Sequence, residues 1–250
     1  MSDATRTALV TGAGNGMGRA HSHELARRGF AVGVADNDET AANRVQAEIQ
    51  SAGGQAISLP CDVSVRSSVE RATARLASWS GGIDVLVSNA GNIHSNELLA
   101  ETDDDNWHRT FAIHVDGALH TTRACLPHLE RSTSGRIIII SSIWGQVGIG
   151  HSYAYCAAKG ALMAFAKNLA KELGPKGISV NSVAPGGVHT RMCAEFTEEE
   201  LREDYKTIPL GRYAQPEEIS HLVAYLASEH SSFMTGQTLS INGGQVIGGF

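Results

Sequence analysis

A glycine-rich turn between the first apolar strand pattern and the first helical pattern constrains this chain more than any other feature. The apolar run Thr7–Val10 leads into Thr-Gly-Ala-Gly-Asn-Gly-Met-Gly at residues 11–18, and a helical pattern follows. Glycine tolerates positive φ and lets a ligand approach the backbone closely, so the turn can present bare N–H groups at a helix N-terminus. Glycines here could also simply make a turn, but the position after a strand and before a helix favours binding of a dinucleotide pyrophosphate. The spacing is G-x3-G-x-G, carried by Gly12, Gly16 and Gly18, rather than the commoner G-x-G-x-x-G.

Short apolar runs alternate with longer helical patterns along the chain. Most of the runs are apolar on both faces, which is typical of parallel strands covered by helices on each side. The predicted strands are Thr7–Val10, Ala31–Ala35, Gln55–Leu59, Asp84–Ser88, Arg136–Ser141, Ser179–Val183 and Thr238–Ile241. Amphipathic stripes predict long helices over 105–131 and 152–174. We therefore expect a single α/β domain over residues 1–250, with a doubly wound Rossmann-type fold: a seven-stranded parallel sheet flanked by helices.

A carboxylate at the end of the second strand indicates which dinucleotide binds. Asp36 follows the run Ala31–Ala35, where an acid is expected to bind the adenosine ribose hydroxyls. Such a carboxylate repels a 2′-phosphate, and no Arg or Lys lies close by in sequence to accept one. The sequence therefore predicts NAD rather than NADP. A loop acid or a helix cap is the alternative for Asp36, and the cap is the role that suits Asp38.

Tyr155 and Lys159 form a candidate acid/base pair. They lie four residues apart and so share one face of a predicted helix. A free tyrosine, with a pKa of about 10, is a poor base near neutral pH. A nearby cation favours the phenolate and is expected to lower that pKa, and an oxidised nicotinamide would act in the same direction. Such pairs are common on exposed helices, but Ser141 and Ser142 end the preceding strand at the edge where the cofactor should lie.

Several separate motifs together resemble the short-chain dehydrogenase/reductase family over nearly the whole chain. Ser142 stands 13 residues before Tyr155, at the position of the family's catalytic serine. Ser88 replaces the first Asn of the family's NNAG. The segments that carry the resemblance are 11–18 (TGxxxGxG), Cys61-Asp62-Val63, Ser88-Asn89-Ala90-Gly91, Tyr155–Lys159 (YxxxK), Pro185–Thr190 (PGxxxT) and Gly236–Gly244.

This resemblance implies that a secondary alcohol and a ketone are interconverted by hydride transfer with NAD. It implies Tyr155 as the general acid/base, Ser142 as the residue that orients the substrate oxygen, and Lys159 as the residue that binds the nicotinamide ribose. A small-molecule alcohol or ketone is the expected partner, and a homotetramer the expected assembly. The expected cofactor-binding residues are Gly12, Asn15, Gly16, Met17, Gly18, Asp36, Asp62, Val63, Asn89, Ala90, Gly91, Tyr155, Lys159, Pro185, Gly186, Val188 and Thr190.

One position departs from the family pattern. His114 stands where the family has an Asn that kinks the helix and holds a water linking the active-site Lys to solvent. An imidazole can also shuttle a proton, so His114 is a candidate member of the catalytic set, although it could equally fill the space.

The substrate pocket is the least determined part of the site. Trp144 and Val147 suggest an apolar wall, with Gln146 and His151 as polar groups, but each could also be an ordinary loop residue.

Two alternative functions remain open. A 3-oxoacyl-carrier-protein reductase is the runner-up, but those enzymes usually combine a basic residue with NADP, and Asp36 argues against that choice. A protein of another class would bind the dinucleotide as a regulator without turnover. The intact set Ser142, Tyr155 and Lys159 argues against a regulator, which has no need of it.

Charge and hydropathy argue against a nucleic-acid-binding protein and against a membrane protein. Twenty Lys and Arg residues against 26 Asp and Glu residues give a net charge of -6, so there is no overall basic field for nucleic acid or an anionic membrane. Apolar runs such as Ile137–Ile140 fall far short of the roughly 20 residues of a membrane span. The N-terminus shows no secretory signal, so we expect a cytoplasmic protein.

The cysteines and histidines suggest neither a disulfide frame nor a metal site. Cys61, Cys125, Cys156 and Cys193 form no CxxC pair, which favours reduced thiols. The closest histidines, His21 and His23, lie two residues apart and so do not share a helix face. We therefore expect no bound metal.

Overall fold

The computed structural model describes residues 5–92, 97–190 and 197–248. Its strands are β1 (Thr7–Thr11), β2 (Ala31–Asp36), β3 (Gln55–Pro60), β4 (Val85–Ser88), β5 (Arg136–Ile140), β6 (Ser179–Pro185) and β7 (Thr238–Ile241). They form one parallel sheet in the order β3-β2-β1-β4-β5-β6-β7. Each predicted strand is present within two residues of its expected ends, and the predicted fold class is confirmed.

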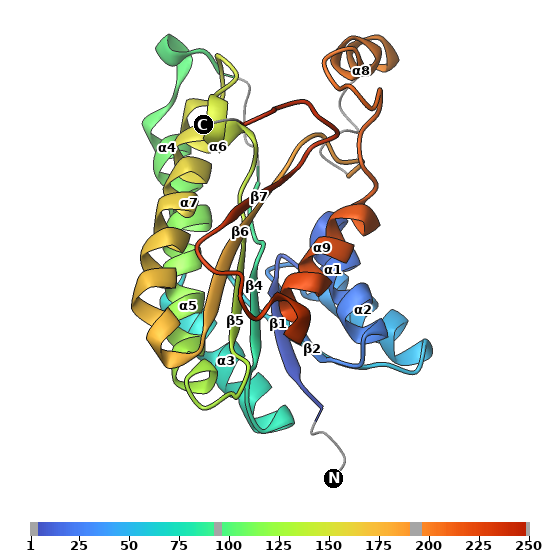
Figure 1. Cartoon of the computed structure of the whole chain (residues 1–250), viewed down its shortest axis with the longest axis vertical. Helices are drawn as coiled ribbons and strands as arrows, with labels where there is room; N and C mark the ends of the chain where they lie inside the picture. Colours follow the sequence, from blue (N-terminus) through green and yellow to red (C-terminus); the bar gives the residue numbers. More distant parts are fainter. Residues whose placement is uncertain (1–4, 93–96, 191–196, 249–250) are drawn as a thin grey trace.

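Helices cover both faces of the sheet (Figure 1). One face carries α1 (Gly16–Arg27), α2 (Glu39–Ser51) and α9 (Pro216–Ala227); the other carries α3 (Arg66–Ser80), α5 (Gly117–Leu129) and α7 (Tyr153–Leu173). Strand side chains alternate between the two faces, so β5 supplies Ile138 and Ile140 to the core beneath the first group. Ile137 and Ile139 of the same strand belong to the core beneath the second group. A strand that is apolar at every position is therefore buried on both sides, as the sequence predicts.

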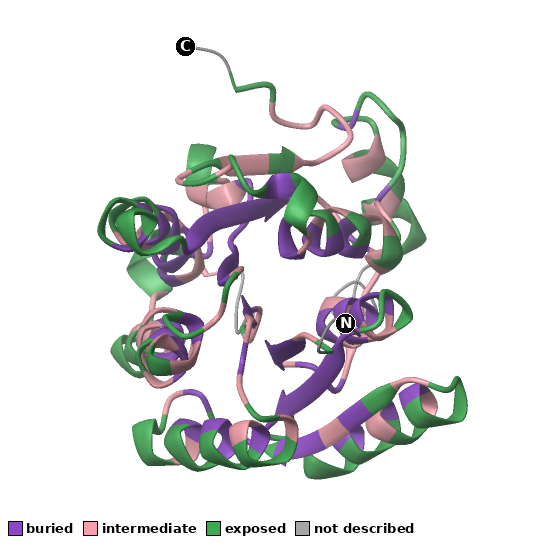
Figure 2. Ribbon diagram, turned by 60° about the horizontal axis from the view of Figure 1, so that its bottom comes forward, coloured by how far each residue is buried: buried purple, intermediate pink, exposed green. Residues whose placement is uncertain are grey.

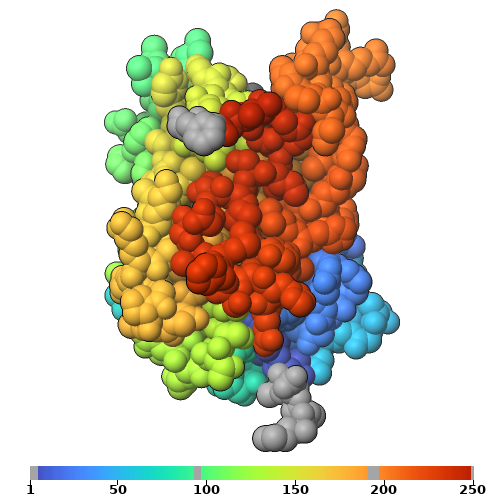
Figure 3. Space-filling view, viewed as in Figure 1, coloured from blue at the N-terminus to red at the C-terminus, as the bar shows by residue number. Residues whose placement is uncertain are grey.

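Burial follows this layering. Figure 2 shows the inner strands of the sheet as buried, with the helices buried on their inner side and exposed on their outer side. The edge strands are less covered: β3 is exposed at both ends, and β7 has only partly buried and exposed residues. In Figure 3 the C-terminal part of the chain covers the middle of one face of the molecule. The remaining regular elements are α4 (Asp104–Phe111), α6 (Trp144–Val147), α8 (Glu198–Tyr205), a π-helical turn (Ala112–Asp116) and 3-10 turns at Leu99–Glu101, Gly174–Lys176 and Glu229–Ser231.

The sheet changes its winding direction at β1. This strand pairs with β2 on one side and with β4 on the other. The connections after β1 and after β4 therefore leave in opposite directions, which opens a crevice at the carboxyl ends of these strands. The glycine turn follows β1, so it lies at this crevice.

The expected helix over 105–131 is not continuous. It consists of α4, the π turn and α5, and the π turn contains His114. A π turn adds one residue to the helical repeat and is frequent at functional sites. The helix is therefore irregular at His114, the position that departs from the family pattern.

The two neighbouring histidines of α1 point to different partners. His21 is buried, and its Nδ1 lies 2.8 Å from the hydroxyl of Ser220 in α9. The Nε2 of His23 lies 2.9 Å from a carboxylate oxygen of Glu48 in α2. Within the described part of the chain, no group of three or more His, Cys, Asp or Glu residues is arranged to hold a metal ion.

Cys61, Cys125 and Cys156 are free thiols, while Cys193 lies outside the described residues. Among the described helices, none combines the length and the apolar character needed to cross a membrane.

Candidate active site

A cleft of about 540 Å³ lies over the carboxyl ends of β1 and β4. Many of the residues predicted to bind a cofactor or act in catalysis line it. They are Gly12, Asn15, Gly16, Met17, Gly18, Asp36, Asp62, Val63, Asn89, Ala90, Gly91, His114, Tyr155, Lys159 and Thr190. Residues more than 170 positions apart in the sequence thus meet in one cavity.

The glycine turn forms one wall, and its shape depends on missing side chains. Gly12 and Gly16 have φ angles of +61° and +49°, which L-residues rarely adopt. A Cβ on Gly18 would lie 2.0 Å from the carbonyl oxygen of Gly12, and one on Gly12 would lie 2.9 Å from the Cα of Ala90. The turn therefore folds tightly on itself and against the end of β4, leaving its backbone open to a ligand.

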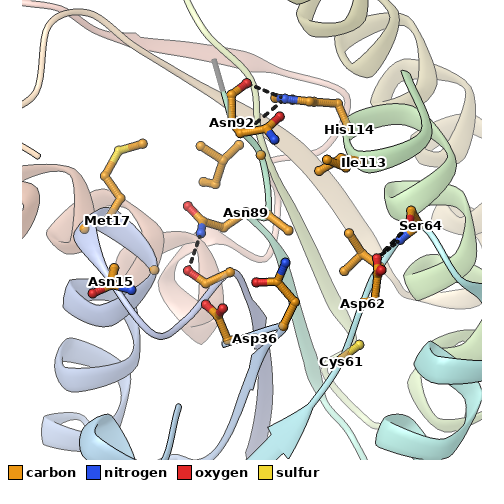
Figure 4. A pocket seen from close by; sticks show the side chains of 18 of the residues that line it. Asn15, Met17, Asp36, Cys61, Asp62, Ser64, Asn89, Asn92, Ile113 and His114 are labelled. Carbon is orange, nitrogen blue, oxygen red and sulfur yellow. Dashed lines mark hydrogen bonds between the residues drawn. The ribbon is translucent and has the colours of Figure 1, made fainter. Parts of the chain in front are cut away.

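Hydrogen bonds between Thr11 and Asn89 connect the end of β1 to the end of β4 beneath the cleft. The Thr11 hydroxyl accepts hydrogen bonds from the backbone N–H groups of Asn89 (3.0 Å) and Ala90 (3.1 Å). The side-chain amide of Asn89 donates to the carbonyl of Thr11 at 2.8 Å, and Figure 4 shows this amide directed at the turn. Asn89 therefore positions the glycine turn with its own side chain.

Asp36 lies beside the same turn at the end of β2. One carboxylate oxygen accepts the N–H of Gly14 at 2.7 Å, and the other accepts the N–H of Asp38 at 2.9 Å. Asp38 in turn caps α2 by accepting the N–H of Ala41, so the cap role predicted for Asp38 is confirmed. Asp36 lines the cleft, where a ribose hydroxyl could donate to it.

A cation from α2 also contacts the glycine turn. No cation is close to Asp36 in sequence, yet Arg44 of α2 reaches the glycine turn. Its guanidinium donates to the carbonyl of Gly14 at 2.9 Å and to the side-chain oxygen of Asn15 at 3.0 Å. Arg44 reaches the turn because α2 packs beside it, a contact that spacing along the sequence does not show.

At the next strand, Asp62 and Val63 form part of the opposite wall. One oxygen of Asp62 accepts hydrogen bonds from both the backbone N–H and the hydroxyl of Ser64. Val63 is buried against Gly117, where an added Cβ would lie 2.8 Å from the valine methyl carbon. Ile113 lies on the same side of the cleft in Figure 4, so an apolar ring could bind beside Val63 and Ile113.

Ser142, Tyr155 and Lys159 come together from β5 and α7. Ser142 is buried just beyond the end of β5 and forms a hydrogen bond with the side chain of Tyr155. Lys159, also buried, donates from Nζ to the carbonyl of Ile140 at 2.8 Å and lies 5.6 Å from the centre of the Tyr155 ring. The Ser141 hydroxyl donates to the carbonyl of Lys159 at 2.7 Å and ties α7 to the strand end.

The pKa of Tyr155 shifts in the opposite direction from the expected one. Burial raises the pKa of this phenol above its ordinary value, and the hydrogen bond with Ser142 offsets the rise only in part. Burial also lowers the pKa of Lys159 to about 7, so its amine is only partly protonated near neutral pH. The predicted lowering by Lys159 is therefore wrong here, because the lysine is itself buried and is bonded to a carbonyl.

His114 contacts both the catalytic tyrosine candidate and a neighbouring loop. Its ring meets the Tyr155 ring edge-on, with centroids 5.7 Å apart. Its Nε2 lies 3.1 Å from the backbone nitrogen and 2.9 Å from the backbone oxygen of Asn92 (Figure 4). A Cβ on Gly91 would lie 2.5 Å from the imidazole, so this ring fits only against a glycine.

Other predicted site residues lie around this centre. In the segment after β6, Thr190 lines the cleft, and its methyl carbon lies within 3.5 Å of a Cβ built on Gly16. Pro185, Gly186 and Val188 precede it; Gly186 donates to the carbonyl of Ile241, and Val188 is buried.

None of the four predicted substrate-pocket residues lines this cleft. Gln146 is hydrogen-bonded to the hydroxyl of Ser240, and Nδ1 of His151 lies 2.9 Å from that of Ser152. Trp144 and Val147 lie in α6, where Val147 is exposed.

Sequence reasoning did not identify several residues of the cleft. They are Asn37, Cys61, Ser64, Arg109, Ala112, Ile113 and Ile140. The helical spacing of Arg109 and Ile113, one turn apart on a single face, is a signal that could have found those two.

Comparisons with known proteins agree with this geometry. The family model described as enoyl-(acyl carrier protein) reductase matches residues 12–245. The oxidoreductase YmfI of Bacillus subtilis is 40% identical over 96% of this chain and 98% of its own length. The trans-4-hydroxycyclohexanecarboxylate dehydrogenase of Sinomonas cyclohexanicum is 40% identical over 98% of this chain and 94% of its own. A crystal structure of a 3-oxoacyl-[acyl-carrier protein] reductase with bound NAD, from Brucella melitensis, superposes with a TM-score of 0.89 at 33% identity, covering 97% of this chain and 92% of that one.

Proposed function

This chain belongs to the short-chain dehydrogenase/reductase family of oxidoreductases, and we propose that it interconverts a secondary alcohol and a ketone with NAD(H) as cofactor. The observation that carries the proposal is that Ser142 and Tyr155 are hydrogen-bonded to each other beside a cleft that begins at the glycine turn. A relative named as a dehydrogenase of a ring-borne secondary alcohol supports the reaction class.

The cleft suits a dinucleotide along its length. The turn can pack this tightly only because Gly12 and Gly18 lack a Cβ, which would clash with the Cα of Ala90 and the carbonyl of Gly12. Bare N–H groups of such a turn at a helix N-terminus bind a pyrophosphate. Asp36 would accept hydrogen bonds from the adenosine ribose, and Lys159 would bind the nicotinamide ribose. Thr190 would lie beside the nicotinamide. A nicotinamide bound here would supply or accept the hydride.

The residues of the chain would handle the proton. Because burial raises the pKa of Tyr155, its phenol is protonated at neutral pH, which is the form that can donate to a ketone oxygen. In the oxidative direction the same oxygen would take the proton from the alcohol. Ser142 would hydrogen-bond the substrate oxygen and hold it against Tyr155. His114, which contacts Tyr155 and Asn92, would hold the tyrosine ring in place, and it stays a candidate for proton exchange.

Cofactor preference provides the first test. We expect NADH to support ketone reduction better than NADPH, because the Asp36 carboxylate repels a 2′-phosphate. Asp36→Ala should narrow this preference by roughly tenfold or more, the effect of one charged hydrogen-bonding group. The measurement is kcat/KM for both cofactors with a panel of ketones. Equal or better use of NADPH by the unaltered protein would contradict the NAD preference.

Reduction of the 3-keto group of 3-oxoacyl carrier-protein thioesters is the second candidate, supported by the likeness to the Brucella reductase. The same assay distinguishes it when 3-oxoacyl thioesters are added to the panel. A strong preference for thioesters over simple or cyclic ketones would support the second candidate. Cofactor binding with no turnover on any member would instead favour the non-catalytic dinucleotide sensor.

We also propose that each copy is one catalytic domain and that four copies associate. The support is that Leu126 of α5 and Phe165 and Leu169 of α7 are only partly buried, leaving apolar surface on both helices. Light scattering should give a mass near four times 26.4 kDa, and a monomer mass would contradict the tetramer. The cytoplasmic location stays a prediction.

A further inference from the structure

We infer that Tyr213 is a positioning residue: with Asp204, Tyr205 and His189 it holds α8 in place beside the cleft, and so it sets the KM for the alcohol or ketone. These four side chains are called the Tyr213 cluster below. The inference rests on the oxidoreductase function proposed above and deepens it. Tyr213 is not among the residues that line the cleft, so it would act through α8.

The helix α8 needs such a support because it adds no residue to the hydrophobic core. It has eight residues, none of which is buried, and a helix this short owes its stability mainly to packing against other elements. Figure 1 shows it standing apart from the sheet, beyond the carboxyl ends of the strands where the cleft opens. Its placement therefore depends on few contacts, and those of Asp204 and Tyr205 lie at its C-terminal end.

Tyr213 contacts α8 with both its hydroxyl and its ring. The hydroxyl donates a hydrogen bond to the Asp204 carboxylate. The ring packs edge-on against the ring of Tyr205, with the two centroids 5.1 Å apart. A hydrogen bond to a carboxylate is stronger than one between neutral groups, so these two contacts together fix the last turn of the helix.

Tyr213 is itself firmly placed. It is buried, and a Cβ on Gly187 would lie 2.1 Å from its ring, so the ring lies directly on the backbone of the segment that follows β6. Two backbone hydrogen bonds join this segment to the residue after Tyr213. Ala214 donates to the carbonyl of Gly187 and accepts from the N–H of His189, both at 2.9 Å. The tyrosine thus connects α8 to a part of the chain that is fixed to the sheet.

His189 connects the Tyr213 cluster to the cleft. The centroid of its ring lies 5.5 Å from that of Tyr213 and 6.3 Å from that of Tyr205. Its Nε2 lies 3.4 Å from the Tyr205 hydroxyl. The next residue, Thr190, lines the cleft. A displacement of α8 would therefore change the wall of the cleft on the side where Thr190 lies.

Loosening the cluster should affect substrate binding rather than the chemical step. If α8 leaves its place in part of the molecules, only the remaining fraction binds substrate, and the KM rises by the inverse of that fraction. At saturating substrate the occupied molecules again have α8 in place, so kcat should stay unchanged. Binding of NADH should also stay unchanged, because the glycine turn and Asp36 belong to other elements.

The experiment combines Tyr213→Phe and Asp204→Ala in a double-mutant cycle, with the ketone of the panel that the unaltered protein reduces fastest. Tyr213→Phe keeps the ring and removes only the hydroxyl. We expect each single variant to raise KM roughly fivefold, the effect of one hydrogen bond, and to change kcat and the NADH dissociation constant less than about twofold. The double variant should raise KM no further, because both substitutions remove the same bond. Asp204→Asn keeps an acceptor and should recover part of the affinity.

Tyr225→Phe is the matched control. Tyr225 is an exposed residue of α9, and its hydroxyl donates to the carbonyl of His230 rather than to α8. Removing this hydroxyl should leave KM unchanged. Hydrogen exchange of the backbone amides over 198–205 gives an independent measurement of α8. The exchange should become faster in Tyr213→Phe and stay at the rate of the unaltered protein in Tyr225→Phe.

The possible outcomes separate the inference from the function on which it rests. If the two single effects on KM add in the double variant, or if kcat and NADH binding fall together with substrate binding, the inference is overturned while the proposed function stands. An unchanged KM in Tyr213→Phe overturns it as well. If the unaltered protein reduces no ketone, the proposed function itself is overturned. Faster exchange over α8 in Tyr213→Phe would then still support its anchoring by Tyr213, and unchanged exchange would overturn it.

Discussion

Tyr155→Phe should lower kcat for ketone reduction by roughly 10²- to 10⁴-fold, the range attributed to a positioned general acid. The substitution removes the hydroxyl that forms the hydrogen bond with Ser142 and that would donate the proton. It keeps the ring, whose edge-on contact with His114 and proximity to Lys159 depend on shape. The dissociation constant for NADH, measured by fluorescence, should therefore change less than about twofold.

Tyr153→Phe provides the control for this prediction. Tyr153 begins the same helix, two residues before Tyr155, and it is exposed. The control variant should keep the turnover of the unaltered protein. Substantial activity in Tyr155→Phe, or a comparable loss in Tyr153→Phe, would refute the assignment of Tyr155 as the acid/base.

Acid should destabilise this protein through His21. Burial lowers the pKa of His21 to about 3, whereas an unfolded chain has a histidine pKa near 6.5. Because the Ser220 hydroxyl donates to the carbonyl of Pro216, it accepts from Nδ1 of His21. The Nε2 is buried and has no hydrogen-bond partner among the described residues, so a proton added there is poorly accommodated.

The sign of the effect follows from this lowered pKa. Well above pH 6.5 the ring is neutral in both states and adds no pH dependence. As the pH falls, the unfolded chain binds a proton that the folded protein does not, so the free energy of unfolding decreases. The loss attributable to His21 should be about 3 kcal/mol between pH 6.5 and pH 4, at about 1.4 kcal/mol per pH unit.

Urea unfolding at several pH values measures this effect. His21→Gln keeps a donor for Ser220 but cannot titrate, so its unfolding free energy should fall less steeply between pH 6.5 and pH 4. His108→Gln is the control, because His108 is exposed and bonds only a backbone carbonyl of its own helix among the described residues. Parallel pH profiles for the unaltered protein and His21→Gln would refute the prediction.

Most of the fold could be predicted because its signals are local. Strands such as β5, apolar on both faces, and the amphipathic stripe of α7 (153–173) depend on residues that follow one another in the chain. The capping role of Asp38 likewise depends on a residue only three positions away. The interruption of the expected 105–131 helix was harder to predict, since a π turn leaves little trace in the periodicity.

The candidate site was predictable where short motifs specify it and unpredictable where long-range packing does. The sequence identified the residues of the glycine turn, Asp36, and the Tyr155–Lys159 pair. It could not give the direction of the Tyr155 pKa shift, because that direction depends on how deeply the fold buries the phenol. It also could not show that Gln146 is hydrogen-bonded to Ser240, 94 positions further along the chain.

By itself, the sequence determined the strand and helix pattern, the parallel sheet and the position of the dinucleotide turn, because each follows from spacing within a short segment. Only the tertiary structure decided that Arg44 donates a hydrogen bond to the Gly14 carbonyl. It alone decided that His114 contacts both the backbone of Asn92 and the ring of Tyr155. It also decided that Lys159 is buried enough for its pKa to fall to about 7. The physical reason is that hydrogen bonding between distant residues and desolvation depend on which elements pack together, and no short segment contains that information.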